Sequence, residues 1–149
     1  MTTLGHILGL ARERAQQLQL PYAGALTPAE AWELLKLAPG ARIVDVRTSA
    51  EWQWVGQVPD AVQIEWNLSN GQRNPDFMTQ LKHQVDPETL VMFLCRSGGR
   101  SHGAATAAAA SGYGNAYNIL EGFEGDLDAN GHRNSVGGWR KAGLPWRQG

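Results

Sequence analysis

The stretch LVMFLCRSGGRSHGAATAAAAS, residues 90–111, predicts the fold class of this chain. It opens with consecutive apolar residues, which is the pattern of a strand buried on both faces of a sheet. It closes with an alanine-rich run, and alanine is both the best helix former and small enough to let a helix lie close to a sheet. A glycine-containing loop with the chain's single cysteine, Cys95, lies between them. The order strand, loop, helix is typical of an α/β protein.

A helix and a strand are predicted upstream of this stretch. TPAEAWELLKLAPG, residues 27–40, has Thr27 as a cap, Pro28 in the first turn and Glu30 to complete a capping box. ARIVDVR, residues 41–47, has β-branched residues clustered over a strand-like length. The region therefore reads as helix followed by strand.

Two further elements complete the alternation. NPDFMTQLKHQV, residues 74–85, predicts a helix capped by Asn74, with Phe77 and Leu81 on one apolar stripe. NAYNI, residues 115–119, predicts a short strand. The alternating order predicts an α/β layer fold in which helices flank a mainly parallel sheet.

Composition excludes several classes of function. The chain has 149 residues, which suits a single core, and its formal net charge of −1 gives no field to recruit nucleic acid or an anionic membrane. No apolar run approaches the roughly 18 residues of a membrane span, and no signal peptide pattern is present. One cysteine excludes an internal disulfide and fits a reducing compartment. We therefore expect a soluble, cytoplasmic protein that binds neither nucleic acid nor membrane.

The chain divides into a helical extension, residues 1–25, and a domain, residues 26–149. Leu4 and Ile7 share one apolar face of the extension, which we expect to dock on the domain because an exposed apolar stripe is costly. Residues 122–138 are rich in glycine and polar residues and predict an ordered surface loop.

The cysteine loop, residues 95–101, has the composition of an anion-binding site. Its glycines permit a tight turn whose backbone N–H groups point inward as an anion-binding nest, and the start of the next helix adds positive charge. These features, with two arginines, favour a nucleophilic thiolate, whereas a buried inert cysteine, the alternative, needs no such surroundings. The predicted site is Cys95 as nucleophile, with a binding loop of Arg96, Ser97, Gly98, Gly99, Arg100 and Ser101.

Spacing within the cysteine loop separates two chemistries. Protein tyrosine phosphatases also place a cysteine, a glycine and an arginine before a helix, but with one residue more between cysteine and arginine. Here residues 96–99 separate Cys95 from Arg100. The smaller ring of amides suits a persulfide or a compact sulfur oxyanion.

Four motifs in order carry a resemblance to one family. CRSGGRS at the end of a strand is similar to the active-site loop of single-domain rhodaneses, which are sulfurtransferases. IVDVRTSAEW (residues 43–52) resembles their early strand motif, and VGQVPDAVQIEW (55–66) resembles a segment that often reads Gly-His-Ile-Pro-Gly-Ala. EGFEGDLDANGHRNSVGGWRKAGLPW (121–146) resembles their closing segment. The resemblance covers residues 26–146 and implies a rhodanese-like fold with three layers.

Two departures from the family pattern affect the expectations. Gln57 and Asp60 stand where many relatives have histidine and glycine, so the shape of that turn is open. GHRNSVGG, residues 131–138, is longer than the simplest family ending and would form a lid or a partner surface.

The resemblance implies a sulfur relay in two half-steps. The Cys95 thiolate would take a sulfane sulfur from thiosulfate, a polysulfide or a persulfide, and the persulfide would pass it to cyanide, a thiol or a carrier protein. No metal or organic cofactor is required. Backbone amides of residues 96–100 would stabilise the anionic sulfur, and Arg96 would hold an incoming anion.

Three further residues are expected to support the site. Arg100 would anchor the cysteine loop through a carboxylate, with Asp45 as the first candidate and Glu51 as the second. For these residues and for Arg47, a structural ion pair is as good an interpretation as direct catalysis.

Two other functions stay open. A non-catalytic rhodanese-like carrier or binding module is one, and the intact Cys95 argues against it. A cysteine phosphatase or arsenate reductase is the other, and the spacing argues against it.

The remaining motifs have structural interpretations. DLDANG, residues 126–131, imitates the start of a calcium loop, but Gly137 stands where a glutamate ligand is required, so a turn is expected. The histidines show no paired spacing, so no metal site is predicted. Three tryptophans are candidates for the pocket wall or for the core: Trp52, Trp54 and Trp66.

Overall fold

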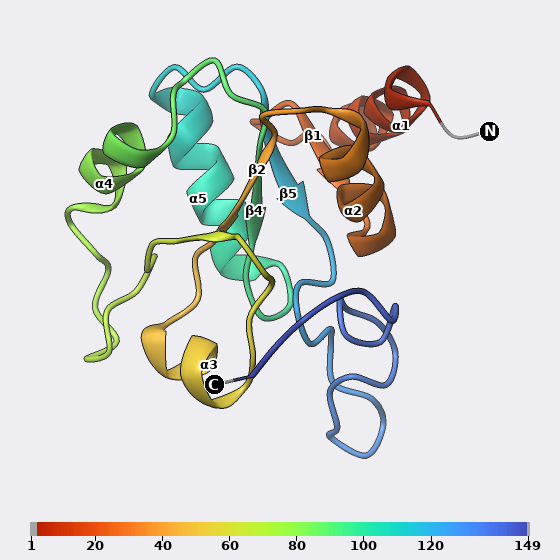
Figure 1. The fold of residues 1–149 in the computed structure, drawn as a ribbon, viewed down its shortest axis with the longest axis vertical. Helices are drawn as coiled ribbons and strands as arrows, with labels where there is room; N and C mark the ends of the chain where they lie inside the picture. Colours follow the sequence, from red (N-terminus) through yellow and green to blue (C-terminus); the bar gives the residue numbers. More distant parts are fainter. Residues whose placement is uncertain (1–2, 149) are drawn as a thin grey trace.

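The computed structural model describes residues 3–148 and contains a five-stranded sheet in the order β1-β5-β4-β2-β3 (Figure 1). The strands are β1 (Gly24–Leu26), β2 (Arg42–Asp45), β3 (Val62–Gln63), β4 (Val91–Leu94) and β5 (Ala116–Ile119). The helices are α1 (Leu4–Leu18), α2 (Pro28–Leu37), α3 (Ser49–Trp54), α4 (Phe77–Gln84) and α5 (Gly99–Ala110). Every strand pair in the sheet is parallel, which confirms the predicted α/β fold class.

Helices cover both faces of the sheet and give it three layers (Figure 1). On the face of α4 and α5, Phe93 of β4 lies in one buried apolar cluster. On the face of α1 and α2, Met92 of the same strand lies in a second cluster. β4 is therefore buried on both sides, which explains why its sequence is apolar throughout instead of alternating.

The ends of α2 and α4 test the helix predictions. Thr27 and Glu30 form the predicted capping box at the start of α2. α4 begins at Phe77, later than predicted, and Asn74 does not cap it. The Asn74 Oδ1 atom accepts a hydrogen bond from the backbone N–H of Asp76, so Asn74 shapes the turn before the helix.

The extension helix α1 docks on the domain, as expected from its apolar face. Ile7, Ala11 and Ala15 are buried. The contact with β1 is close, because a Cβ atom on Gly24 would lie 2.8 Å from the backbone carbon of Ala11. β1 itself spans residues 24–26, so the boundary drawn between residues 25 and 26 falls inside a strand.

Three short elements were not predicted: β1, α3 and β3. β3 has two residues, and its strand character comes from pairing with β2. α3 has a capping box formed by Thr48 and Glu51, a signal that the sequence does carry. Within residues 3–148, no helix combines the length and the apolarity that crossing a membrane requires.

The strand order indicates at which end of the sheet a binding crevice is expected. From β2 the chain proceeds to β3 on one side, and from β4 it proceeds to β5 on the other side. Such a reversal opens a crevice beyond the carboxyl ends of the two central strands. α3, the start of α5 and the segment after β5 gather at this end, at the bottom of Figure 1.

Candidate active site

Cys95 lies directly after β4 and opens the cysteine loop. Gly98 has a φ of 114°, a left-handed conformation that favours glycine, and this turn brings its backbone N–H to 3.1 Å from the Cys95 Sγ atom. α5 begins at the next residue. The predicted turn from strand to helix is therefore present, with its first inward amide pointing at the sulfur.

Cys95 is part of the buried apolar cluster on the face of α4 and α5, and its sulfur also meets two polar groups. Cys95 is 1% exposed, and its Sγ atom lies 3.3 Å from the Ser101 Oγ atom. Within residues 3–148, the Gly98 N–H and the Ser101 hydroxyl are the groups at hydrogen-bonding distance from Sγ. The expected ring of amides from residues 96–100 is thus represented at Sγ by a single N–H.

Asn118 of β5 extends this polar network, and sequence reasoning missed it. The Ser101 hydroxyl donates to the Asn118 Oδ1 atom over 2.6 Å, and the Asn118 Nδ2 atom donates to the Gly98 carbonyl over 3.3 Å. Both Ser101 and Asn118 are buried. The available signal was an asparagine inside the strand motif NAYNI, since a buried amide in a strand needs partners.

The segment after β5 donates backbone hydrogen bonds to the first residues of the cysteine loop. The backbone N–H of Phe123 donates to the Cys95 carbonyl over 2.8 Å, and that of Glu124 donates to the Arg96 carbonyl over 3.0 Å. Gly122 permits this approach, because a Cβ atom there would lie 2.5 Å from the Arg96 carbonyl carbon. These bonds occupy the carbonyl groups of the first two loop residues and fix the loop against the sheet.

Arg100 is anchored by Glu51 and not by Asp45. Its Nη1 and Nη2 atoms donate to the two carboxylate oxygens of Glu51 over 2.7 and 3.0 Å. The expectation that Asp45 would be the first partner is wrong, because a bidentate pair needs a carboxylate facing the guanidinium and α3 supplies it. The hydrogen bond to Glu51 and the charge of that carboxylate raise the pKa of Arg100 against the effect of burial.

Asp45 and Arg47 pair with each other inside the domain. Both side chains are 0% exposed, and the Arg47 Nη2 atom lies 2.8 Å from the Asp45 Oδ2 atom. Nη2 also donates to the Gly56 carbonyl over 2.7 Å, and the guanidinium lies 4.3 Å from the centre of the Phe123 ring. This geometry is that of a structural ion pair which joins β2 to its neighbouring loops.

Arg96 and Ser97 form the outer part of the cysteine loop. Arg96 is exposed and Ser97 is half-buried. Arg96 makes no ion pair within residues 3–148. Its charge is therefore available to an anion that approaches the loop from solvent.

The departures from the family pattern have local structural explanations. Asp60 adopts a φ of 64°, the left-handed conformation that glycine favours. The backbone groups of Gln57 and Arg147 pair, so the end of the chain lies along this turn. Within the 131–138 insertion, the N–H of Asn134 donates to the Glu124 carbonyl over 2.7 Å, which ties the insertion to the segment behind the cysteine loop.

The tryptophans and the calcium-like motif take ordinary structural places. Trp66 is buried in the core, whereas Trp54 is 72% exposed. In the 126–131 motif, the Asp128 Oδ1 atom accepts from the N–H groups of Asn130 and His132, as in a turn. Within residues 3–148, no group of three or more His, Cys, Asp or Glu side chains has the arrangement to hold a metal ion.

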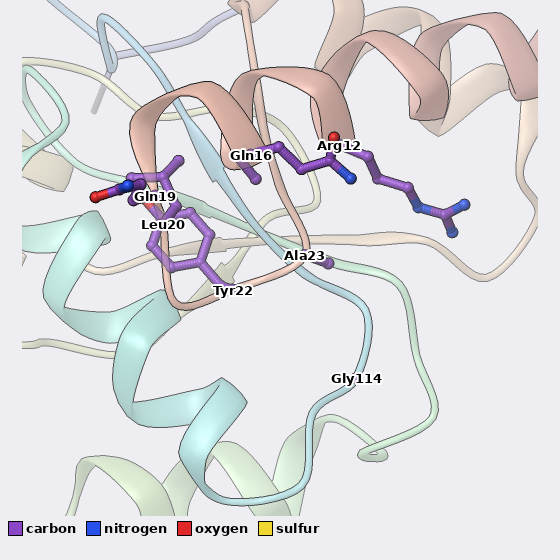
Figure 2. A pocket seen from close by; sticks show the side chains of 8 residues that line it. Arg12, Gln16, Gln19, Leu20, Tyr22, Ala23 and Gly114 are labelled. Carbon is purple, nitrogen blue, oxygen red and sulfur yellow. The ribbon is translucent and has the colours of Figure 1, made fainter.

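An open pocket of about 380 Å³ lies beside the C-terminal end of α1 (Figure 2). Arg12, Gln16 and Tyr22 help to line it, and no residue of the cysteine loop does. Tyr22 lies next to α5, where its hydroxyl is 2.8 Å from the His102 Nδ1 atom. The pocket is therefore separate from the thiol.

A parallel sheet flanked by helices, with a cysteine in a tight loop at the carboxyl end of its central strand, defines the class of this protein as an α/β domain with a cysteine loop. The family profile described as "Rhodanese-like domain" matches residues 27–129. The chain belongs to the rhodanese-like family.

Similar proteins agree with this assignment. The crystal structure of Rv0390 from M. tuberculosis has a TM-score of 0.79 and 51% sequence identity, over 86% of this chain and 99% of that one. Uncharacterized protein RP600 of Rickettsia prowazekii is 36% identical over 79% of this chain and 92% of its own length. A protein named Sulfurtransferase from Allochromatium vinosum is 31% identical over 69% of this chain and 75% of its own length.

Proposed function

We propose that this protein is a sulfurtransferase that carries a sulfane sulfur as a persulfide on Cys95. The observation that carries the proposal is the position of Cys95 Sγ, which accepts the Gly98 N–H over 3.1 Å at the start of α5. The charge of Arg100 lies on the same helix. The Allochromatium relative named Sulfurtransferase supports the same reaction class.

In the first half-step, the Cys95 thiolate attacks the outer sulfur of an anionic donor such as thiosulfate. A bond forms between Sγ and that sulfur, and the donor's sulfur–sulfur bond breaks. Sulfite leaves with the bonding electron pair, and the negative charge stays on the terminal sulfur of the persulfide. The exposed Arg96 would attract the donor, since its charge has no ion-pair partner within residues 3–148.

In the second half-step, an acceptor attacks the terminal sulfur and Cys95 leaves as a thiolate. Cyanide gives thiocyanate, and a thiol or a carrier protein gives a new persulfide. Both half-steps balance without an external oxidant or reductant. N–H groups of the cysteine loop would stabilise the terminal sulfur, because backbone dipoles in a fixed turn stabilise a localised anion. The need to keep Cys95 reduced suits a cytoplasmic location.

The experiment is intact-mass measurement after exposure to thiosulfate or polysulfide. The protein should gain the mass of one sulfur atom, and cyanide should remove it with release of thiocyanate. Because Cys95 is the chain's single cysteine, Cys95→Ser should gain no sulfur. Sulfur on the Cys95→Ser variant, or none on the wild type with any donor, contradicts the proposal.

The same samples separate the other functions. A carrier or binding module would release at most one sulfur per protein to cyanide or a thiol, whereas an enzyme would release many in the presence of excess donor. A phosphatase would hydrolyse an aryl phosphate and lose that activity in Cys95→Ser.

A further inference from the structure

Four hydrogen bonds around Cys95 form a closed ring. Its members are Cys95, Ser101, Asn118 and Gly98. The distances around the ring are 3.3 Å from Sγ to Ser101 Oγ, 2.6 Å from there to Asn118 Oδ1, 3.3 Å from Asn118 Nδ2 to the Gly98 carbonyl, and 3.1 Å from the Gly98 N–H back to Sγ. Each member therefore has one neighbour to donate to and one to accept from.

The direction of the ring follows from its fixed members. The Gly98 carbonyl can only accept, so the Asn118 atom facing it is Nδ2 and the atom facing Ser101 is Oδ1. Oδ1 can only accept, so Ser101 directs its single hydroxyl proton to Asn118. Ser101 can then only accept a hydrogen bond from Cys95. The hydrogen bond between them therefore forms when Cys95 is a thiol whose S–H donates to the Ser101 Oγ atom.

Ionisation of Cys95 breaks the ring. When the thiol proton leaves to water, the sulfur keeps the electron pair and can only accept. Ser101 then has one proton for two acceptors, the thiolate and the Asn118 Oδ1 atom. Asn118 is 3% exposed, so water does not readily replace the lost donor.

We propose that Asn118 is a positioning residue that opposes ionisation of Cys95 by holding the Ser101 hydroxyl away from the sulfur. It acts against the positive charges of the site and sets how readily the thiolate of the sulfurtransferase reaction forms. The proposal rests on the proposed function for its biological meaning, but its geometry concerns only the proton on Cys95.

Other titratable and charged groups surround the site, and one of them, Tyr22, also depends on Asn118, whose side chain works against the burial that raises the pKa of Tyr22. They come from the cysteine loop and α5, from α3, from β2 and the residues after it, and from the segment before β1. They are Arg96, Arg100, His102, Glu51, Asp45, Arg47 and Tyr22. A change in their contribution would act with or without the Ser101 hydroxyl, whereas the proposed effect of Asn118 requires it.

The test is the pH profile of Cys95 alkylation by iodoacetamide, followed by intact mass. Asn118→Leu has a similar shape and no acceptor, so the Ser101 hydroxyl can turn to the thiolate. The midpoint of the profile should fall by about 0.5 to 1 pH unit, the size expected for one hydrogen bond. In a Ser101→Ala background the same Asn118→Leu change should leave the midpoint where Ser101→Ala alone puts it.

Two further variants keep the test decisive. Asn118→Ala removes the same oxygen without new bulk and takes the place of Asn118→Leu if that variant does not fold. Asn118→Asp keeps an acceptor and adds charge, so its midpoint should rise. A fall of equal size in both Ser101 backgrounds, no fall, or a rise with Asn118→Leu overturns the proposal.

Alkylation needs only the thiol, so this test is independent of sulfur transfer. A profile that responds as expected in a protein that never gains sulfur would leave the role of Asn118 intact and remove the sulfurtransferase function. Sulfur gain together with an alkylation profile that does not respond to Asn118→Leu would support the sulfurtransferase function and remove the role of Asn118.

Discussion

Two arginines at the same edge of the sheet differ in what their charge does. Arg47 follows β2 and Arg100 lies in the first turn of α5, and the side chain of each donates more than one hydrogen bond to a carboxylate. The Arg47 side chain is 0% exposed, whereas that of Arg100 is 23% exposed. Arg47 packs on Phe123 and joins structural elements, whereas Arg100 lies on the helix that follows the cysteine loop.

The comparison shows that an arginine near the end of a central strand is not functional by position alone. The Arg47–Asp45 pair is fully buried, so its charge is not accessible to a ligand, although the Arg47 Nη1 atom has no hydrogen-bond partner within residues 3–148. The partly exposed Arg100–Glu51 pair lies at the start of the helix that follows the cysteine loop, and Glu51 fixes the direction of the Arg100 guanidinium. The two arginines therefore predict opposite outcomes for the same type of substitution.

The largest effect is expected for Arg47→Met. It leaves the Asp45 carboxylate buried without its partner, and breaking a buried pair in this way costs about 3–5 kcal/mol of stability. Urea unfolding should show the loss, or the variant should fail to fold. Lys36→Met breaks the exposed pair with Glu33 and serves as the control, with a loss below about 1 kcal/mol. Equal losses in the two variants would contradict the structural role of the buried pair.

The next effect is expected for Arg100→Gln, which removes charge next to Cys95 and retains a polar side chain. Loss of a nearby positive charge disfavours an anionic sulfur, and a cost of about 1.4 kcal/mol would lower the rate of persulfide formation about tenfold. Thermal unfolding should change less than in Arg47→Met, because the Arg100–Glu51 pair is partly exposed. A variant that loses stability and keeps its rate would place Arg100 with Arg47 as a structural residue.

The sequence was enough to predict those features whose interacting residues are neighbours along the chain. The strand, the glycine turn and the helix around Cys95 are continuous in sequence, so local patterns were enough to predict them. The α2 capping box and the apolar face of α1 are also local, and both are confirmed.

The sequence was not enough where a residue's hydrogen-bonding or pairing partner lies in another helix or strand. Asp45 and Glu51 are both acidic residues near β2, and only the direction of α3 decides which one meets Arg100. Asn118 is far from Cys95 in sequence and reaches the site because β5 pairs with β4. β3 is a strand because it pairs with β2, so two residues of sequence carry too little pattern to predict it.

The smallest effect concerns pH and the Glu51 carboxylate. Burial is the largest influence on its pKa and works upward, but the hydrogen bonds and charge of Arg100, with the Thr48 backbone and the charge of Arg47, outweigh burial and leave the pKa below its ordinary value. A carboxyl with a lowered folded-state pKa stabilises the fold fully above its ordinary pKa of about 4.3, and this contribution is lost as pH falls through the folded value.

Glu51→Gln should therefore remove one part of the acid dependence of unfolding. The difference in stability between wild type and variant should be at most about 1 kcal/mol near pH 7, since the pair is partly exposed, and should shrink below about pH 4. Urea unfolding at several pH values measures it. A difference that stays constant down to pH 3 would mean that Glu51 acts through its shape and not through its charge, and the anchoring of Arg100 by an ion pair would then be wrong.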